Sequence, residues 1–127
     1  TTLLGLIDEE NGILYFINAQ HPNPVLLRDG KAIYIPAKNQ YSKLGYYPDF
    51  DREEIENDIT VSSFRLKEND IVLCGSDGKD DLVIGHSKSG KREINNDENM
   101  FLEIVEKSQG NLNSIYNALK SHGEIID

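Results

Sequence analysis

Short apolar runs alternate with turn-forming pairs along the first third of the chain. Each turn holds a glycine preceded by Asn or Asp, a combination that favours tight β-hairpins because both positions accept positive φ angles. Two β-hairpins are therefore predicted. Their strands are expected at residues 2–8, 13–18, 24–28 and 32–36, with turns at Asn11-Gly12 and Asp29-Gly30. Because apolar residues fall on both faces of the first two strands, we expect a sheet that is covered on both sides.

The middle of the chain is less regular. Residues 37–58 mix charged, aromatic and turn-forming side chains without a clear period, so they are predicted to form a long irregular connection. Residues 59–66 predict a strand, and a bulge is expected near Ser62-Ser63 because the apolar positions change face there. Residues 71–76 predict a buried strand that pairs with residues 59–66 as a hairpin through residues 67–70.

The last third changes from strand-like to helical periodicity. Residues 80–84 are predicted to form a short helical turn, and residues 85–96 an exposed polar loop. Two amphipathic helices follow, starting near Asn96 or Asp97 and near Asn111 and ending at Gly110 and Gly123. Their apolar faces are expected to hold Phe101, Ile104 and Val105 in the first helix, and Leu112, Ile115, Tyr116 and Leu119 in the second. Strands followed by helices indicate an α+β fold with mainly antiparallel sheet.

Composition narrows the classes of partner. The chain has 22 acidic and 13 basic residues and a net charge of −9, which argues against non-specific binding to nucleic acid or to an anionic membrane. No apolar run approaches the roughly 18 residues that span a bilayer, so no direct membrane contact is expected. The single cysteine, Cys74, lies in a predicted buried strand; one cysteine excludes an intramolecular disulfide and suggests a reducing compartment.

The tetrapeptide Ser76-Asp77-Gly78-Lys79 carries the most informative chemistry in the chain. A strand that ends here would place the Asp77 carboxylate at the rim of a sheet, and Gly78 would allow the backbone to turn sharply after it. Magnesium and manganese ions prefer carboxylate oxygens as ligands. Asp77 is therefore a candidate metal ligand, and the alternative interpretation is an ordinary Asp-Gly turn.

The order of motifs along the chain favours the metal interpretation. A strand leads into Asn18-Ala19-Gln20-His21-Pro22, Leu44-Gly45 follows, and Ser76-Asp77-Gly78 comes last. This order resembles the C-terminal half of the SpoIIE-like branch of the metal-dependent type 2C (PPM family) serine/threonine protein phosphatases, over almost the whole chain. Family members usually have glycine where this chain has Gln20, a departure that bears on the backbone geometry of that turn.

The resemblance implies a fold of antiparallel sheets flanked by helices, of the α-β-β-α sandwich type. It implies hydrolysis of phosphoserine or phosphothreonine with two Mg²⁺ or Mn²⁺ ions, with Asp77 as a catalytic metal ligand. Asp127 stands where a second ligand would fall; the alternative for Asp127 is a frayed chain end. The family's first metal-binding segment does not precede Thr1, so residues 1–127 are expected to form a single, N-terminally truncated domain that is inactive by itself.

The resemblance also implies partners and a cellular setting. Family members often act on small phosphorylated regulators, so the expected substrate is a phosphorylated regulatory protein such as an anti-sigma-factor antagonist. Sensor modules fused upstream and a cytoplasmic location are implied, with any membrane anchor outside this chain. The alternative is a non-catalytic regulatory or interaction module with a phosphatase-like shell, which Gln20 and the missing first motifs favour.

Other polar residues are expected to have structural roles. His21 precedes a proline and is interpreted mainly as fixing a turn through a backbone hydrogen bond, with a catalytic role as the alternative. His86 and His122 are expected to be exposed, and Asp80-Asp81 to form a cap or a solvated acidic pair rather than outer contacts to a metal. The segment Gly85–Lys91 only loosely matches a phosphate-binding loop, because it does not join a strand to a helix.

Overall fold

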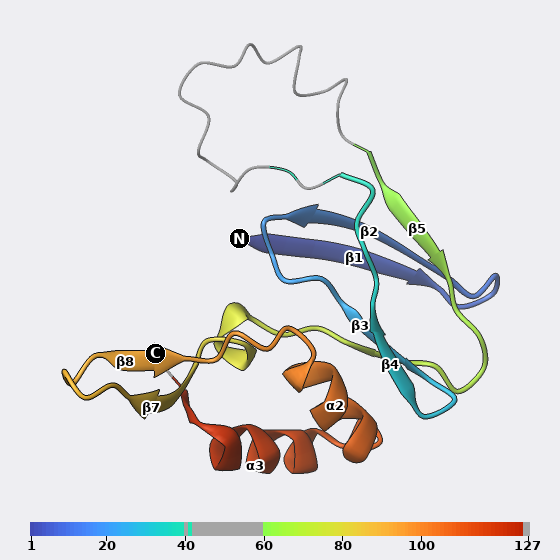
Figure 1. Cartoon of the computed structure of the whole chain (residues 1–127). Helices are drawn as coiled ribbons and strands as arrows, with labels where there is room; N and C mark the ends of the chain where they lie inside the picture. Colours follow the sequence, from blue (N-terminus) through green and yellow to red (C-terminus); the bar gives the residue numbers. More distant parts are fainter. Residues whose placement is uncertain (40, 42–59, 126–127) are drawn as a thin grey trace, which may run out of the picture. The chain divides into compact units, whose positions relative to one another are not determined.

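The computed structural model describes residues 1–39, residue 41 and residues 60–125 (Figure 1). Most of the predicted irregular connection at 37–58 therefore lies outside the described residues, and so does Asp127. The chain divides into two compact units, which are described separately here. Unit 1 comprises Thr1–Asn23 and Ile35–Asn69, and unit 2 comprises Pro24–Tyr34 and Asp70–Asp127. Antiparallel sheets occur in both units and two α-helices in unit 2, which confirms the predicted α+β class.

Unit 1 contains a three-stranded antiparallel sheet in the order β1-β2-β5 (Figure 1). The strands β1 (Thr2–Asp8) and β2 (Ile13–Ala19) form the first predicted hairpin. In its turn, Gly12 has a φ of +63°, a conformation that glycine adopts without strain. Asp8 accepts hydrogen bonds from the side-chain and backbone nitrogens of Asn11, at 2.8 and 3.0 Å. These bonds lower the pKa of Asp8.

The two faces of this sheet differ in burial. Leu14 and Phe16 of β2 are only 6% and 2% exposed. Leu4 and Leu6 of β1 lie on the opposite face and are 66% and 63% exposed. Among the described residues, the face of the sheet that carries Leu14 and Phe16 is therefore covered, and the face that carries Leu4 and Leu6 is open. The sequence predicted cover on both faces.

The third strand of this sheet, β5 (Ser62–Arg65), is shorter than the predicted strand and pairs regularly with β2. The predicted bulge near Ser62-Ser63 is therefore wrong. The apolar positions seemed to change face because Val61 is apolar but 47% exposed, on the same side of the alternation as the exposed Ser63 and Arg65. Within β5, Ser62 is buried, and its hydroxyl accepts a hydrogen bond of 2.9 Å from the backbone nitrogen of Lys38.

The first sheet of unit 2 has the strand order β4-β3-β6. The strands β3 (Val25–Arg28) and β4 (Lys31–Tyr34) form the second predicted hairpin. Asp29 and Gly30 both have positive φ angles, +51° and +74°, as a tight turn requires. The third strand, β6 (Ile71–Leu73), pairs antiparallel with the other edge of β3.

The predicted hairpin between residues 59–66 and residues 71–76 is therefore wrong, because β6 pairs with β3 instead of β5. The physical reason is that β3 is almost wholly buried and occupies the centre of its sheet, with a partner strand on each edge. The Arg28 guanidinium also binds both carboxylate oxygens of Asp70, at 2.9 and 2.6 Å, and so fixes the start of β6 beside the end of β3. Hydrogen bonding to Asp70 raises the pKa of Arg28.

The second sheet of unit 2 has the strand order β8-β7-β9. Its strands are β7 (Leu82–His86), β8 (Arg92–Ile94) and β9 (Glu124–Ile125). The predictions of a helical turn at 80–84 and a loop at 85–96 are therefore wrong. Leu82 is fully buried, and β7 gains strand partners both from the next segment and from the end of the chain, a pairing that local sequence does not show.

The two predicted helices are present in unit 2 as α2 (Met100–Lys107) and α3 (Leu112–His122). The helix α2 starts later than predicted because Asp97 accepts a hydrogen bond of 2.9 Å from the Asn99 nitrogen in a turn before the helix. The helix α3 starts as predicted, since the Asn111 side chain accepts a hydrogen bond of 3.0 Å from the backbone nitrogen of Ser114.

The core of unit 2 is built from side chains of both of its sheets and of both helices. Its buried members include Val25 and Leu27 from the sheet, Leu82 from β7, four residues of α2 and two of α3. On α3, only Ile115 and Leu119 of the predicted apolar face are buried, whereas Leu112 and Tyr116 are 69% and 54% exposed. The predicted face of α3 is therefore too wide. Gly110, between the helices, is tightly enclosed: a Cβ there would lie 2.9 Å from Ile71 Cδ1.

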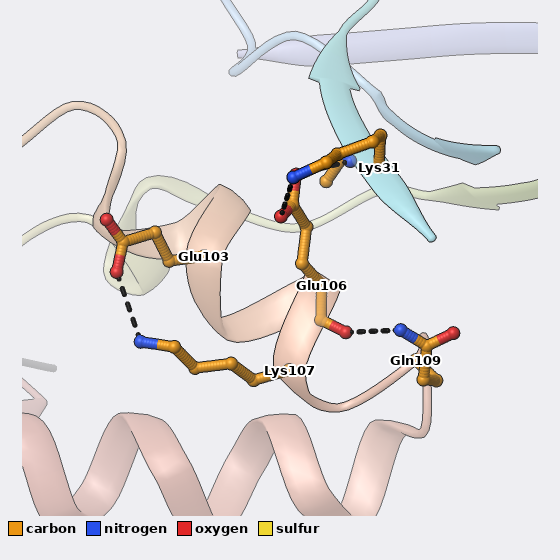
Figure 2. A network of polar contacts seen from close by, with 6 residues as sticks. Lys31, Glu103, Glu106, Lys107 and Gln109 are labelled. Carbon is orange, nitrogen blue, oxygen red and sulfur yellow. Dashed lines mark hydrogen bonds and ion pairs between the residues drawn. The ribbon is translucent and has the colours of Figure 1, made fainter. Parts of the chain in front are cut away.

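A polar network ties α2 to the first residues of β4 (Figure 2). The Glu106 carboxylate accepts hydrogen bonds from the Ala32 backbone nitrogen at 3.0 Å and from Lys31 Nζ at 3.2 Å. The backbone oxygen of Glu106 also accepts a bond of 2.6 Å from Gln109 Nε2. The hydrogen bond from Ala32, followed by that from Lys31, lowers the pKa of Glu106 below its ordinary value of 4.5.

The Glu106 contacts predict an acid-dependent loss of stability. Because the pKa is lower in the folded state, the unfolded state binds the proton more readily below pH 4.5, and the free energy of unfolding should fall as the pH drops through that range. Replacing Glu106 with Gln should remove this part of the pH dependence. Denaturant unfolding from neutral to acid pH measures it, with the exposed Glu68→Gln as control. Equal acid slopes in the wild-type protein and the Glu106→Gln variant would contradict the prediction.

Candidate functional site

Asp77 is the first residue of a short 3-10 helix, η1 (Asp77–Lys79), which follows β6 after three irregular residues. Its backbone oxygen accepts hydrogen bonds from the nitrogens of Asp80 and Asp81, at 2.8 and 3.0 Å. Asp77 is exposed, and within the described part of the chain its carboxylate forms no hydrogen bond or ion pair. A carboxylate held on an ordered turn and not neutralised by a cationic side chain fits the role of ligand to a hard divalent cation.

The segment before Asp77 differs from the prediction of a buried strand. The strand β6 ends at Leu73, Ile71 is 39% exposed, and Cys74 is exposed. Only one face of this edge strand packs on the core, so the continuous apolar run does not indicate burial on both faces. Partial desolvation raises the pKa of the Cys74 thiol, which therefore remains protonated at neutral pH and is a poor nucleophile.

Lys79, at the end of η1, is a buried residue that could not be expected inside the protein from its place in the sequence. It is 8% exposed, and its ammonium group forms an ion pair with the Asp80 carboxylate. The same nitrogen lies 4.9 Å from the centre of the Phe101 ring and 5.5 Å from that of Tyr34. Burial, followed by the charges of Asp80 and Glu98, raises the pKa of the Tyr34 phenol.

The predicted acidic pair Asp80-Asp81 divides into two different environments. Asp80 pairs with Lys79, and its backbone oxygen lies 3.4 Å from Asn95 Nδ2. Asp81 is exposed, and its backbone nitrogen donates the hydrogen bond to the backbone oxygen of Asp77. Asp80 is therefore part of the support of η1.

The turn that contains His21 lies in unit 1 and is organised by Asn18, which is fully buried. Asn18 Oδ1 accepts a bond of 2.8 Å from the His21 nitrogen, and Asn18 Nδ2 donates to the His21 oxygen at 2.8 Å. His21 Nδ1 lies 2.9 Å from the backbone oxygen of Pro22. These contacts favour the structural interpretation of His21. Gln20 has a φ of +51°, so the chain keeps a glycine-like turn although the residue is not glycine.

The structure describes the remaining candidate positions apart from Asp127. His86 and His122 are exposed, as predicted, and Gly85–Lys91 forms the tip of the β7–β8 hairpin. Within residues 1–39, 41 and 60–125, no group of three or more His, Cys, Asp or Glu side chains could hold a metal ion. The position of Asp77 relative to His21 and Asp127 at one rim stays a prediction. Among the described helices, none is long and apolar enough to cross a membrane.

Comparison with known proteins bears on the identity of this fold. The family model of stage II sporulation protein E (SpoIIE) matches residues 1–127. The crystal structure of the RsbU and RsbW domains of Rv1364c from Mycobacterium tuberculosis is similar, with a TM-score of 0.68 and 20% sequence identity. The match covers 97% of this chain and 32% of that chain, so this chain spans about a third of its structural relative. No curated protein sequence matches significantly.

These findings confirm the resemblance that the motifs suggested. The structural match supports the same antiparallel α+β architecture, and the family match extends over every residue of the sequence. The chain therefore belongs to the SpoIIE family of type 2C-like phosphatase domains.

Proposed function

We propose that this chain is part of a domain that hydrolyses phosphoserine or phosphothreonine on a regulatory protein, with Mg²⁺ or Mn²⁺ as cofactor. The observation that carries the proposal is the exposed Asp77 carboxylate, which is held on η1 and has no cationic partner among the described residues. Membership of the SpoIIE family supports phosphatase chemistry in general.

In this proposal Asp77 binds one side of a two-ion centre, and Asp127 supplies a second ligand. When bound, the two cations would lower the pKa of a water molecule and offset negative charge on the phosphoryl oxygens. The described residues supply no cluster of three ligands, so the proposal requires further carboxylates from outside them. No protein nucleophile is needed, which agrees with the raised pKa of the Cys74 thiol.

The partner proposed for this site is a phosphorylated regulatory protein, such as an anti-sigma-factor antagonist, in the cytoplasm. The similar solved structure contains an RsbU and an RsbW domain in one chain, which supports a setting of interacting regulatory domains. Sensor modules fused to the phosphatase domain belong to the same proposal, as does the assignment of residues 1–127 to one domain. The net charge of −9 supports a partner other than nucleic acid.

A second candidate function is a non-catalytic interaction module with a phosphatase-like shell. The observation in its favour is that no three metal-binding side chains converge among the described residues. Gln20 does not favour it, because this residue keeps the left-handed backbone conformation that glycine usually provides.

Turnover of a phosphoserine peptide and of an aryl phosphate separates the two functions. We expect the complete protein to hydrolyse both substrates in the presence of Mn²⁺ and to lose activity with a chelator. We expect residues 1–127 alone to show little turnover, because hydrolysis needs two ions held together. Absence of metal-dependent turnover by the complete protein would favour the interaction module. Robust turnover by residues 1–127 alone would show that Asp77 and the other residues of this chain suffice for the centre.

A further inference from the structure

Lys79 is an unusual residue to find inside a protein. Lysine is almost never fully buried unless its charge is paired, because removing an ammonium group from water is costly. Lys79 is nevertheless 8% exposed, and it lies two residues after Asp77. Such a cost is tolerated where the buried group makes specific contacts, so the contacts of Lys79 indicate its role.

Three groups from different parts of unit 2 surround the Lys79 ammonium. Asp80 pairs with it directly, Tyr34 comes from the end of β4, and Phe101 comes from the first turn of α2. The distances to the ring centres, 5.5 and 4.9 Å, are within the range in which a cation is attracted to an aromatic face. The attraction is stronger for a desolvated cation, and Lys79 is desolvated. One side chain thus connects η1 to β4 and to α2.

Among the described residues, few other polar side-chain contacts hold the short helix η1 in place. It is three residues long, and a single 3-10 turn has weak hydrogen-bond geometry. Its N-cap residue, Ser76, makes no side-chain capping bond. Asn95 Nδ2 approaches the Asp80 backbone oxygen at 3.4 Å, a long contact for a hydrogen bond. The buried Lys79 side chain is therefore the principal anchor of this turn among the described residues.

We infer that Lys79 is a positioning residue that fixes where η1 presents the Asp77 carboxylate. The inference rests on the proposed metal-binding function of Asp77. A metal ligand must be held within a fraction of an ångström of its productive position, and residues that orient ligands affect affinity without touching the ion. Lys79 acts in this way by tying the far end of η1 to the rings of Tyr34 and Phe101.

The test compares Lys79→Met with Lys79→Arg in the complete protein. Methionine keeps length and apolar packing but loses the ion pair and the attraction to the rings, whereas arginine keeps the charge. We expect Lys79→Met to raise the Mn²⁺ concentration needed for half-maximal activity by about 10- to 100-fold, with a much smaller change in kcat at saturating Mn²⁺. Lys79→Arg should restore most of the affinity. Titration of Mn²⁺ binding by electron paramagnetic resonance gives the same comparison without turnover.

Two control variants separate positioning from general damage. Lys107→Met removes an exposed lysine of α2 with the same change in charge, and Val105→Ala destabilises the core of unit 2 without removing either ring that faces Lys79. Both should keep the wild-type Mn²⁺ dependence. Amide exchange at Asp80 and Asp81, which bond to the Asp77 oxygen, should accelerate in Lys79→Met and not in Lys107→Met. If Lys79→Met does not fold, Phe101→Leu, which removes one ring, should weaken Mn²⁺ binding to a smaller extent.

The inference is overturned if Lys79→Met binds Mn²⁺ like the wild type, if Lys79→Arg is no better than Lys79→Met, or if Val105→Ala weakens binding equally. When Lys79→Met does not fold, wild-type Mn²⁺ affinity in Phe101→Leu overturns it. These results differ from failure of the proposed function, in which the wild-type protein itself would show neither Mn²⁺ binding nor metal-dependent turnover.

Discussion

Replacement of Asp77 with Asn is expected to abolish metal-dependent hydrolysis by the complete protein while the fold stays intact. Asparagine keeps the size of the side chain but removes the negative charge that holds a hard cation. The decrease in turnover should exceed the roughly 100-fold decrease that follows when a residue that only orients a metal ligand is removed. Because the Asp77 carboxylate makes no hydrogen bond or ion pair with the described residues, its replacement should leave the melting temperature almost unchanged.

The matched control is Asp29→Asn, the same chemical change at an exposed turn residue of unit 2. Asparagine tolerates the positive φ at this position, so neither stability nor activity should change. Steady-state turnover of a phosphoserine peptide across a Mn²⁺ series measures the difference between the two variants. Wild-type turnover in Asp77→Asn would contradict the metal interpretation and indicate that Ser76-Asp77-Gly78 is an ordinary turn.

Replacement of Asn18 with Ala is expected to lower the free energy of unfolding by about 2–4 kcal/mol, since a lost hydrogen bond that leaves a buried polar group unsatisfied costs about 1–3 kcal/mol. Asn18 is fully buried, and its amide contacts both the nitrogen and the oxygen of His21. Its Nδ2 also lies 3.2 Å from Asn23 Oδ1. Alanine removes all three bonds at once.

Two further variants define the cause of the loss. Asn18→Asp keeps an acceptor for the His21 nitrogen but removes the donor to the His21 oxygen. Its free energy of unfolding should lie at or below that of the wild type. Because the side-chain volume hardly changes, such a loss would come from the missing hydrogen bond. Asn39→Ala removes one exposed contact of 3.2 Å to Thr60 and should cost less than about 0.5 kcal/mol. Chemical denaturation measures each value. Equal stability of Asn18→Ala and Asn39→Ala would contradict the prediction.

The elements predicted correctly are those whose cause is local. The hairpin turns at Asn11-Gly12 and Asp29-Gly30 form because these residues accept the required φ angles. The start of α3 follows from the capping bond of Asn111 to a nitrogen three residues away. The order of a strand followed by the Asp77 turn could likewise be read from the apolar run and the Asp-Gly pair, although β6 ends at Leu73, three residues before the predicted end.

The errors arose where distant segments compete for a strand edge. The strand β6 follows β5 in the chain, but the buried strand β3 and the ion pair of Arg28 with Asp70 determine its partner. The segment predicted as a helical turn at residues 80–84 overlaps the start of the strand β7, whose partner β9 comes from the other end of unit 2. Strand pairing depends on which apolar faces are buried together, and a local sequence pattern does not contain that information.

For the candidate site, the sequence by itself determined the family, the Asp-Gly pair and the choice of Asp77 as a candidate metal ligand, a role that stays a prediction. Only the tertiary structure decided how the turn is supported, because the burial of Lys79 depends on Tyr34 and Phe101, which are distant in the chain. It also decided that Gln20 keeps the backbone conformation of a glycine. Residue type and order specify local geometry and chemistry, whereas burial and electrostatic partners are properties of residues brought together by folding.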